Sequence, residues 1–416
     1  MQNYDLHGGL PKGLHSETGN VVLAVAPEPA ARWNDNSMPT GPIRERDQAK
    51  TAPMSTILSI TTDRKNGGIA TALGSYSAAL TKRGHEHIVI LPSGAAAVDG
   101  LAGMAGVSLV TMPAAMIRSH LLTGSLFHGR LRAAIGAADL IFVHNANLAP
   151  LARRSGKPVC LISHSGKLRH LAAADNAVFL SRAAQTRARD MLGPQRESHP
   201  QIHIIPHGFP VYEPAPGQAS SSGPVRVISA GRFVPKKGFE VLLQAASLLQ
   251  QRGSAIAFDI YGDGPLRPVL ADMICRLGLD NVTLHGWRPS LDEAFAKADL
   301  FCLPSLEEPF GLVIGEGMGR GLPMVATRTD GPLDVIGQNG SDREQTLASG
   351  GILTTPGDAT GLADGLEFLA GDHDRLAAAA EAARRRITSN FGMDALADRL
   401  DALIATARQP RQAGPL

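Results

Sequence analysis

The stretch MSTILSITTDRKNGGIATALGSYSAALTKRGHEHIVIL, residues 54–91, contains the pattern that decides the fold. An apolar run is followed by a glycine loop, a segment rich in Ala and Leu, and a second apolar run. This order predicts a strand, a loop, a helix and a parallel strand, the repeating unit of doubly wound α/β domains. Gly67 and Gly68 lie in the loop, where backbone amides can approach an anion at the start of the helix. A tight strand-to-helix turn would explain the same two glycines.

The same alternation continues along the chain and predicts two domains. Short apolar runs that end in polar or small residues are typical of buried parallel strands, and they occur at 85–91, 139–145, 158–164, 177–181 and 203–208. A segment rich in Pro, Gly and Ser, 211–224, predicts an interdomain linker, and a second alternating series follows it. We therefore predict an α/β protein with two doubly wound, Rossmann-like domains, 54–212 and 224–390, which face a central cleft where ligands bind.

The two ends of the chain differ from these domains. Residues 1–53 mix Gly, Pro, Asn and charged residues without sustained periodicity, so we expect a disordered N-terminal tail, and Met54 is a candidate biological start. Residues 391–408 are amphipathic with a helical period.

Composition excludes several classes of protein. Of 416 residues, 44% are hydrophobic, and 40 Lys and Arg residues nearly balance 38 Asp and Glu residues, so nothing in the net charge of +2 indicates nucleic acid. Cys160, Cys275 and Cys302 form no CxxC motif, which predicts a reducing, cytoplasmic compartment with each cysteine as a small core residue. No stretch approaches the roughly 18 apolar residues of a membrane span. We expect a protein that contacts a membrane only at its surface, if at all.

The stretch SAGRFVPKKGFEVLLQAA, residues 229–246, predicts an anion site in the second domain. A strand ends at Gly231, Arg232 follows, and Lys237 stands just before the next helix, while Lys236 is expected to face solvent. Two cations at a strand end beside a helix N-terminus suit a diphosphate, because Arg binds it with two donors and Lys with a point charge. A solvated basic turn is the alternative.

The stretch EEPFGLVIGEG, residues 307–317, places two acids on either side of a plain apolar run. Pro309 suits the first turn of a helix, so we predict a helix from about Phe310, with Glu308 at its start and Glu316 about two turns deeper. Two carboxylates suit a ligand with many hydroxyl groups, and the amides of Gly311 and Leu312 can meet a phosphate or a hydroxyl. Stabilisation of the helix dipole explains Glu308 equally well, and a surface position explains Glu316.

Three histidines end predicted strands, namely His144, His164 and His207. In a cleft, His164 could bond a hydroxyl group of a ligand, and a bond to the backbone is the alternative. The DHDR segment, 372–375, has the spacing of a metal-binding D-x-D motif, but its place before an Ala-rich segment favours capping of a helix by Asp372. No cluster of metal ligands is visible, so we expect no metal and no cofactor.

The chain resembles the GT-B glycosyltransferases of the large retaining family 4, glycosyltransferase group 1. The resemblance rests on NGGIA, GRFVPKKG, YGDGPLR, LPSLEEPFGLVIGEGMGRGLPMVAT and DGPLDVI, and it extends from about residue 54 to the end. It implies that Arg232 and Lys237 hold the donor diphosphate, with Gly67 and Gly68 nearby. Glu308 and His164 are then expected at the donor sugar with catalytic roles, beside Phe310, Gly311 and Leu312. Glu316 is expected on the ribose hydroxyls, and Trp287 and Arg288 near the base.

The resemblance further implies a retaining transfer of a sugar from a nucleotide diphosphate, UDP- or GDP-linked, to a carbohydrate or lipid-linked acceptor in bacterial surface-polysaccharide or lipopolysaccharide synthesis. The first domain is then the acceptor domain, which the helix at 391–408 completes, and the second is the donor domain. A GT-B epimerase, a phosphorylase and a non-catalytic binding protein for nucleotide sugars stay open. The segment 116–134, with Arg118, Arg130 and Arg132, suits contact with anionic lipid at the inner membrane surface, or an ordinary solvated helix.

The chain departs from the family pattern at three places. His207 stands where the family has Asn, Asp334 stands in place of a Glu, and Gly315 and Gly317 flank Glu316 in the predicted helix. Each glycine in a helix costs up to about 1 kcal/mol relative to Ala, and the sequence offers no reason for this pair.

Overall fold

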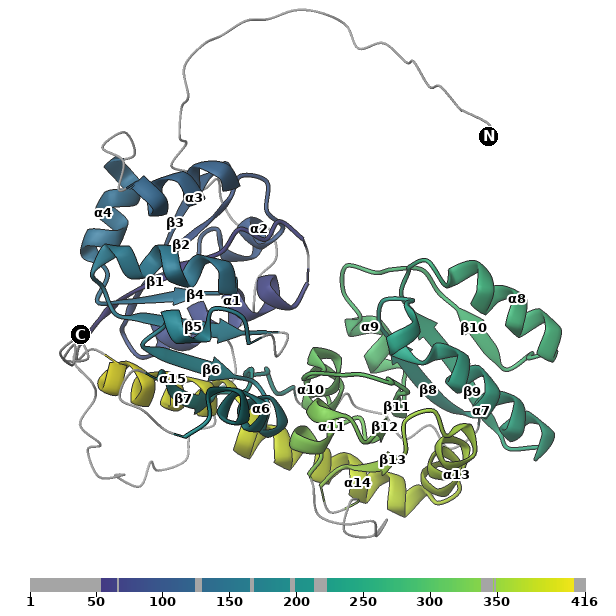
Figure 1. Cartoon of the computed structure of the whole chain (residues 1–416). Coiled ribbons are helices and arrows are strands. Elements are labelled where there is room, and N and C mark those ends of the chain that lie inside the picture. The colour runs from purple at the N-terminus through teal and green to yellow at the C-terminus, as the bar shows by residue number, and fades with distance from the viewer. Residues whose placement is uncertain are drawn as a thin grey trace, which may run out of the picture.

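The computed structural model describes residues 54–407 except 66, 124–128, 165–167, 195–198, 213–222, 338–346 and 348. Our predictions for residues 1–53 and for most of the linker fall outside the described residues. Figure 1 shows two lobes, each with a sheet inside and helices around it. The predicted fold class, two Rossmann-like domains, is confirmed.

The first lobe contains a parallel sheet of seven strands in the order β3-β2-β1-β4-β5-β6-β7. All five strand runs predicted after residue 84 are present as strands or strand ends. A half-exposed strand, β3, lies outside that prediction because its apolar run is interrupted by small and polar residues. The strands are β1 (Thr56–Ile60), β2 (Glu86–Pro92), β3 (Val107–Met112), β4 (Leu140–Val143), β5 (Val159–Ser163), β6 (Asn176–Phe179) and β7 (Gln201–Ile204).

Side chains of the first sheet alternate between two apolar cores. Leu58 and Ile60 of β1 enter one core, and Ile57 enters the other, which also contains Tyr76 of α1. A strand buried on both faces in this way reads as a continuous apolar run. The helices of this lobe are α1 (Gly68–Lys82), α2 (Ala97–Leu101), α3 (Ala114–Thr123), α4 (Gly129–Ala137), α5 (Ala149–Ala152) and α6 (Arg182–Leu192), with short 3₁₀ turns at Ala146–Leu148, Arg153–Ser155 and Leu171–Ala173.

The second lobe contains a parallel sheet of six strands in the order β10-β9-β8-β11-β12-β13. Asp372 caps α14 through a bond from the Arg375 amide, at 3.0 Å, as the sequence predicts. The strands are β8 (Val225–Ala230), β9 (Ile256–Tyr261), β10 (Val282–Leu284), β11 (Leu300–Leu303), β12 (Met324–Thr327) and β13 (Gly351–Thr354). The helices are a 3₁₀ turn (Pro235–Lys237), α7 (Phe239–Gln251), α8 (Arg267–Leu277), α9 (Asp292–Ala296), α10 (Leu312–Gly319), α11 (Asp330–Val335), α13 (Ala359–Ala370) and α14 (His373–Arg386).

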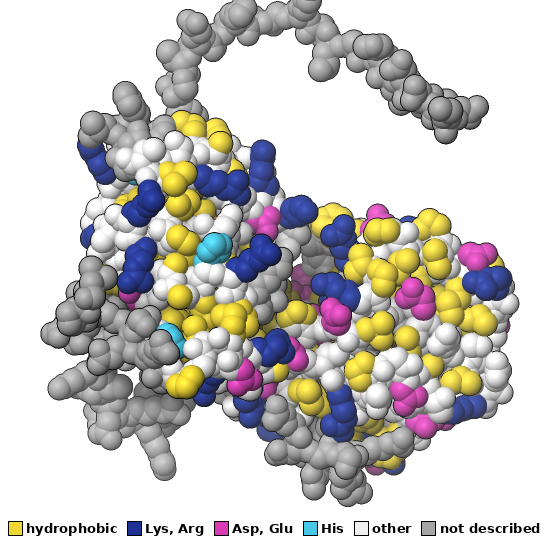
Figure 2. Space-filling view, viewed as in Figure 1, with side chains coloured by type: hydrophobic (Ala, Val, Ile, Leu, Met, Phe, Trp, Pro, Cys, Tyr) yellow, Lys and Arg dark blue, Asp and Glu magenta, His cyan; other side chains and the backbone are white. Residues whose placement is uncertain are grey.

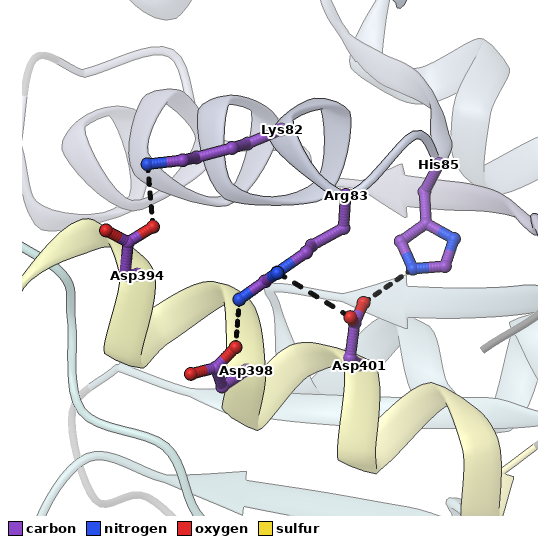
Figure 3. Close-up of polar contacts among 6 residues, drawn as sticks. All are labelled: Lys82, Arg83, His85, Asp394, Asp398 and Asp401. Atoms are coloured by element: carbon purple, nitrogen blue, oxygen red, sulfur yellow. Dashed lines mark hydrogen bonds and ion pairs between the residues drawn. The ribbon is translucent and has the colours of Figure 1, made fainter. Parts of the chain in front are cut away.

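The chain returns to the first lobe at its end. After a π turn at Ile387–Phe391, helix α15 (Met393–Ala407) runs along the first lobe, and Leu396, Leu400 and Ile404 of α15 join the core that contains Tyr76. Figure 3 shows three acids of α15 opposite the end of α1. Lys82 pairs with Asp394 at 2.6 Å, Arg83 pairs with Asp398, and His85 bonds Asp401 at 2.7 Å.

Two predictions about single positions are wrong. The helix predicted from about Phe310 begins at Leu312, so Pro309 precedes the helix and does not lie in its first turn. Gly311 adopts a left-handed conformation (φ 83°), which non-glycine residues rarely tolerate, and it sets the later start. Cys275 lies on the exposed side of α8, whereas Cys160 and Cys302 are buried as predicted.

Candidate functional site

The candidate site lies where the strand order of the second sheet reverses, between β8 and β11. Ligands of doubly wound domains bind at such a point, because the loops after the two strands diverge there. The loop after β8 carries Arg232 and Lys237, and the loop after β11 carries Glu308. The two loops touch at Gly238, where a Cβ atom would lie 2.1 Å from the carbonyl oxygen of Pro304. Gly238 is therefore required for this close approach.

Lys237 and Glu308 form an ion pair across these loops. The Glu308 side chain is 7% exposed and the Lys237 side chain 20%, and Ser305 Oγ donates to Glu308 Oε2 at 3.3 Å. The structure thus brings together one residue predicted for the diphosphate and one predicted for the sugar. The pair fixes the direction of the Lys237 ammonium group, which retains further N–H donors for a ligand.

An open hollow of about 550 Å³ lies beside Lys237 and is lined by residues 232 and 234–237. Figure 2 shows a recess between the two lobes. Arg232 is exposed and makes no ion pair with any described residue. Its guanidinium group is therefore available to an anionic ligand, in contrast to Lys237. Lys236 is exposed, as predicted.

Two helix N-termini face each other across the cleft. Helix α10 begins after Gly311 and α1 begins after Gly67, and among the described residues no side chain caps either of them. The start of α1 lies against the start of α10, because a Cβ atom on Gly68 would be 3.7 Å from Cδ1 of Leu312. Uncapped amides at both helix starts suit an anion or a hydroxyl between the lobes.

Glu316 lies on α10 and is half-buried. Burial raises the pKa of its carboxyl group, while the nearby Arg320 opposes that shift. In the described part of the chain, its carboxylate accepts no hydrogen bond, and Arg320 bonds only its backbone carbonyl, at 3.0 Å. The two predicted acids are thus not equivalent, since Glu308 is ion-paired, whereas the Glu316 carboxylate forms no hydrogen bond or ion pair with the described residues.

The glycines around Glu316 have a packing reason that the sequence does not reveal. A Cβ atom on Gly315 would lie 2.2 Å from the ring of Phe209, and one on Gly319 would lie 2.5 Å from the carbonyl oxygen of Pro210. Residues 209 and 210 belong to the segment that leaves the first lobe. The face of α10 that carries Gly315 and Gly319 therefore packs against the segment that crosses between the lobes. Gly317 lies next to Phe301, where a Cβ atom would be 3.3 Å from the Phe301 ring.

The strand-end histidines of the first lobe lie close together, on the side of the cleft opposite the loops that follow β8 and β11. Nδ1 of His144 lies 2.9 Å from Nε2 of His164, and the rings of His164 and His207 are nearly parallel at 5.7 Å. His207 also contacts the edge of Phe310 at 5.2 Å. The Phe310 ring is buried there and stacks on Phe209, so the ring is not open to a ligand.

Trp287 and Arg288, predicted near the base, are exposed beyond β10 and do not line the hollow. The Trp287 side chain is 60% exposed. The neighbouring rings of Tyr261 and His285 stack at 4.3 Å, and His285 bonds Asp259 at 2.7 Å.

Two further groups join the site or its frame and were not predicted. Asn145, just after β4, accepts from Oγ1 of Thr61 at 2.9 Å and from the Thr62 amide at 2.7 Å, so it ties together the two strand ends at the reversal point of the first sheet. The position of Asn145 directly after an apolar run was the signal in the sequence that could have predicted this role.

Asp334 accepts hydrogen bonds from the backbone amide and from Nε of Arg182, at 2.5 and 2.9 Å, across the two lobes. The position of Asp334 in the sequence, directly after an aliphatic residue in a short helix, gives no sign of a contact between the lobes.

Comparison with known proteins agrees with this geometry. Residues 224–372 match the model of the family glycosyl transferases group 1. The lipopolysaccharide core biosynthesis glycosyltransferase LpsE of Rhizobium meliloti is 31% identical over 183 residues, which cover 43% of this chain and 49% of that protein. A GDP-mannose-dependent α-(1-6)-phosphatidylinositol monomannoside mannosyltransferase of Mycobacterium tuberculosis is 26% identical over 83% of this chain and 97% of its own. The chain thus spans about half the length of LpsE and nearly all of the mannosyltransferase.

Solved structures share the architecture at low identity. Anabaena Alr3699/HepE in complex with UDP-glucose matches with a TM-score of 0.68 and 22% identity, over 85% of this chain and 100% of that one. The lipopolysaccharide outer core galactosyltransferase WaaB matches with a TM-score of 0.59 and 15% identity. Such likeness concerns the fold alone. The second domain thus matches the glycosyl transferases group 1, and the chain has the two-lobed GT-B fold of these solved structures.

Proposed function

We propose that the protein is a retaining glycosyltransferase that moves a sugar from a nucleotide diphosphate to an acceptor hydroxyl. The observation that supports this most is the combination at the reversal point of the second sheet. There, Arg232 and the Lys237–Glu308 pair lie beside the uncapped start of α10, and the start of α1 faces them. Cations and helix N-termini at one point suit a diphosphate leaving group.

Negative charge grows on the leaving diphosphate as the bond to the sugar breaks. Arg232, Lys237 and the two helix starts would stabilise that charge, since they are held in place before the reaction. Glu308 is committed to Lys237, so it orients the cation and offers its remaining oxygen to a sugar hydroxyl. We therefore favour departure and attack on the same face of the sugar, with an oxygen of the leaving phosphate accepting the proton of the acceptor. A glycosyl adduct trapped on Glu308 would contradict this mechanism.

The donor is proposed to be a UDP- or GDP-linked hexose, with Glu316 on the ribose hydroxyls, Trp287 and Arg288 near the base, and His164 at the sugar. Proteins similar to this one carry both donor types in their names. Relatives named for lipopolysaccharide core and colanic acid synthesis support a role in bacterial surface polysaccharides.

The first lobe is proposed to bind the acceptor, at the cytoplasmic face of a membrane. None of the helices among the described residues combines the length and hydrophobicity needed to cross a bilayer. Residues 54–210 carry 16 Lys and Arg residues against 7 Asp and Glu residues, whereas residues 224–390 carry 16 against 21. Figure 2 shows basic side chains gathered on the first lobe. A basic lobe suits an anionic surface that presents a lipid-linked acceptor.

A panel of UDP- and GDP-hexoses, offered with and without surface-polysaccharide precursors, tests the activity through release of free nucleotide and analysis of the product. We expect acceptor-dependent release with retention at the anomeric carbon. The Lys237→Ala variant should lower turnover at least about tenfold, whereas Lys297→Ala, an exposed lysine of the same lobe, should not change it. Unchanged turnover of Lys237→Ala would remove Lys237 from the site. Conversion of the donor without an acceptor would instead indicate an epimerase, and binding without release a non-catalytic protein.

A further inference from the structure

A continuous chain of buried hydrogen bonds ends at His164. On the side of the first sheet that faces α1, Oγ of Ser77 lies 2.8 Å from Nδ1 of His87, and Nε2 of His87 lies 2.8 Å from Oγ of Ser59. Oγ of Ser59 lies 3.1 Å from Nε2 of His144, and Nδ1 of His144 lies 2.9 Å from Nε2 of His164. The chain thus joins α1, β2 and β1 to the ends of β4 and β5.

All three imidazoles of this chain are neutral at physiological pH. Burial lowers the pKa of His87 to about 3 and that of His164 to about 4, although the Asp63 charge opposes the second shift. Burial, and then the neighbouring histidines, hold the pKa of His144 well below its usual range. Each ring therefore carries one N–H donor and one acceptor nitrogen.

Proton counting favours one direction for the chain. Ser59 and Ser77 are fully buried, and each hydroxyl proton must find an acceptor, because an unsatisfied buried donor is costly. Within the described residues, Ser77 Oγ bonds only His87, so Ser77 donates to Nδ1 of His87. His87 then donates from Nε2 to Ser59, and Ser59 donates to Nε2 of His144.

The same direction continues to the cleft. With Nε2 occupied, His144 carries its proton on Nδ1 and donates to Nε2 of His164. His164 must then carry its proton on Nδ1, a buried atom with no partner among the described residues. The reverse direction leaves two groups unmatched among the described residues, the Ser77 proton in the fully buried core and the acceptor Nδ1 of His164, whereas the first direction leaves only the Nδ1–H of His164, at a strand end beside the cleft. If both rings donated to Ser59, the Ser59 proton would have no acceptor.

We propose that this chain fixes His164 as the Nδ1–H tautomer, so that His164 acts on the bound ligand as a neutral hydrogen-bond donor and not as a general base. Ser59 and His144 are then positioning residues, since they act only through His164. The ligand atom is an oxygen that accepts a bond, on the donor sugar or its leaving phosphate. This identification of the ligand rests on the proposed function, whereas the tautomer does not.

The tautomer can be measured without any ligand. In protein labelled with ¹⁵N-histidine, ring ¹⁵N shifts and ring N–H couplings should show a protonated Nδ1 on His164 and His144 and a protonated Nε2 on His87. The His164→Asn variant assigns the signals. An Nε2–H tautomer of His164 would overturn the proposal. Ser59→Ala should populate both tautomers of His164, whereas Ser229→Ala, which removes a buried hydroxyl without a partner from the corresponding strand β8, should leave the spectrum unchanged.

Activity gives a second and separable test. Asn can place an amide N–H near the position of Nδ1, whereas Leu cannot, so His164→Asn should keep kcat/KM within about threefold of the parent and His164→Leu should lose about tenfold or more. Equal losses in the two variants would overturn the donor role. If the parent protein transfers no sugar, the proposed function fails, and the tautomer measurement still decides whether the buried chain orients His164.

Discussion

At the scale of single residues, the site depends on which charges are already paired. Lys237 is bound to Glu308 before any ligand arrives, and Arg232 is not. A paired lysine is held in one rotamer, and its partner Glu308 lies in a nearly buried position. The unpaired arginine can instead close on a diphosphate with two parallel bonds.

The Lys237–Glu308 pair should contribute to stability as well as to chemistry. Glu308→Gln leaves a partly buried ammonium group without its counter-charge, so we expect a loss of about 1–3 kcal/mol in the free energy of unfolding. Urea unfolding followed by fluorescence or circular dichroism measures this. Glu307→Gln, at the exposed neighbour, should change the free energy by less than about 0.5 kcal/mol. Equal effects of the two changes would show that the pair contributes nothing.

Glu316 should make donor binding depend on pH. Because burial raises the pKa of its carboxyl group, the folded protein keeps this proton to a higher pH than the unfolded chain, and ionisation costs stability as the pH rises through the raised pKa. A ribose hydroxyl that donates to the carboxylate favours the charged form, so donor affinity should fall as the pH drops through that same value. Calorimetric titration with a nucleotide sugar over this range measures it, and Glu316→Gln should flatten the profile. A slope that survives in Glu316→Gln assigns the titration to another group.

At the scale of elements, α10 has two structural roles, and the sequence pattern alone does not distinguish them. Its first residues end the loop that carries Glu308, and its glycine face receives the crossing segment at Phe209. The backbone amide of Phe209 in turn bonds the carbonyl oxygen of Phe391 at 2.8 Å, where the chain crosses back. Both crossings between the lobes therefore meet beside α10, the helix that carries Glu316.

Two glycines of this helix, Gly315 and Gly317, should respond differently to alanine. Gly315→Ala places a methyl group inside the Phe209 ring, so we expect a loss of about 1–3 kcal/mol or more in the free energy of unfolding. Gly317→Ala meets Phe301 at 3.3 Å, a contact that small shifts relieve, and alanine improves helix propensity by up to about 1 kcal/mol. The net change should therefore stay within about 1 kcal/mol of zero. Thermal and urea unfolding compare the two, and a tolerated Gly315→Ala would contradict this packing.

At the scale of the whole molecule, a second contact holds the two lobes together away from the crossings. Asp334 of α11 bonds the first amide and the side chain of Arg182 at the start of α6, and Asp330 pairs with Arg187 at 2.7 Å. Arg386 of α14 donates hydrogen bonds to the backbone carbonyl oxygens of Asp334 and Val335. The acid that replaces the usual Glu is therefore part of the interdomain frame.

Removing this contact should loosen the relative position of the lobes. In Asp334→Ala, α6 loses a carboxylate at its N-terminus and Arg182 loses its partner, so we expect a larger radius of gyration by small-angle scattering and a weaker effect of donor on that radius. Asp364→Ala breaks an exposed pair with Arg252 inside one lobe and serves as the control. Identical scattering of the two variants would indicate that the crossings alone set the arrangement.

The basic first lobe should bind anionic membranes in a salt-dependent way. Arg118 and Arg132 are exposed on α3 and α4, near Leu122, which is 48% exposed. Vesicles with anionic lipid should co-sediment with the protein at low salt and release it as salt rises, because screening shortens the range of the attraction. Arg118→Glu with Arg132→Glu should weaken binding, whereas Arg276→Glu on the second lobe should not. Binding that ignores both salt and these changes would remove this face as the contact.

Much of the fold follows from local signals in the sequence. Apolar runs that end in small or polar residues, separated by helical segments, indicate buried parallel strands, and such runs predict both sheets. The same signals place Arg232, Lys237, Glu308 and His164 at strand ends, where the carboxyl edges of parallel sheets collect functional groups. The sequence predicts the start of α10 at about Phe310 and not at Leu312, because the left-handed conformation of Gly311 depends on tertiary contacts.

Taken by itself, the sequence determined the two domains, their order and the chemical type of the residues at their facing edges, because these depend on short-range periodicity and on the ends of strands. Only the tertiary structure decided which residues meet. The pairing of Lys237 with Glu308, the packing of Gly315 on Phe209 and the hydrogen-bond chain from Ser77 to His164 join positions far apart in the chain. No local pattern encodes such contacts, since each requires two surfaces to close on each other.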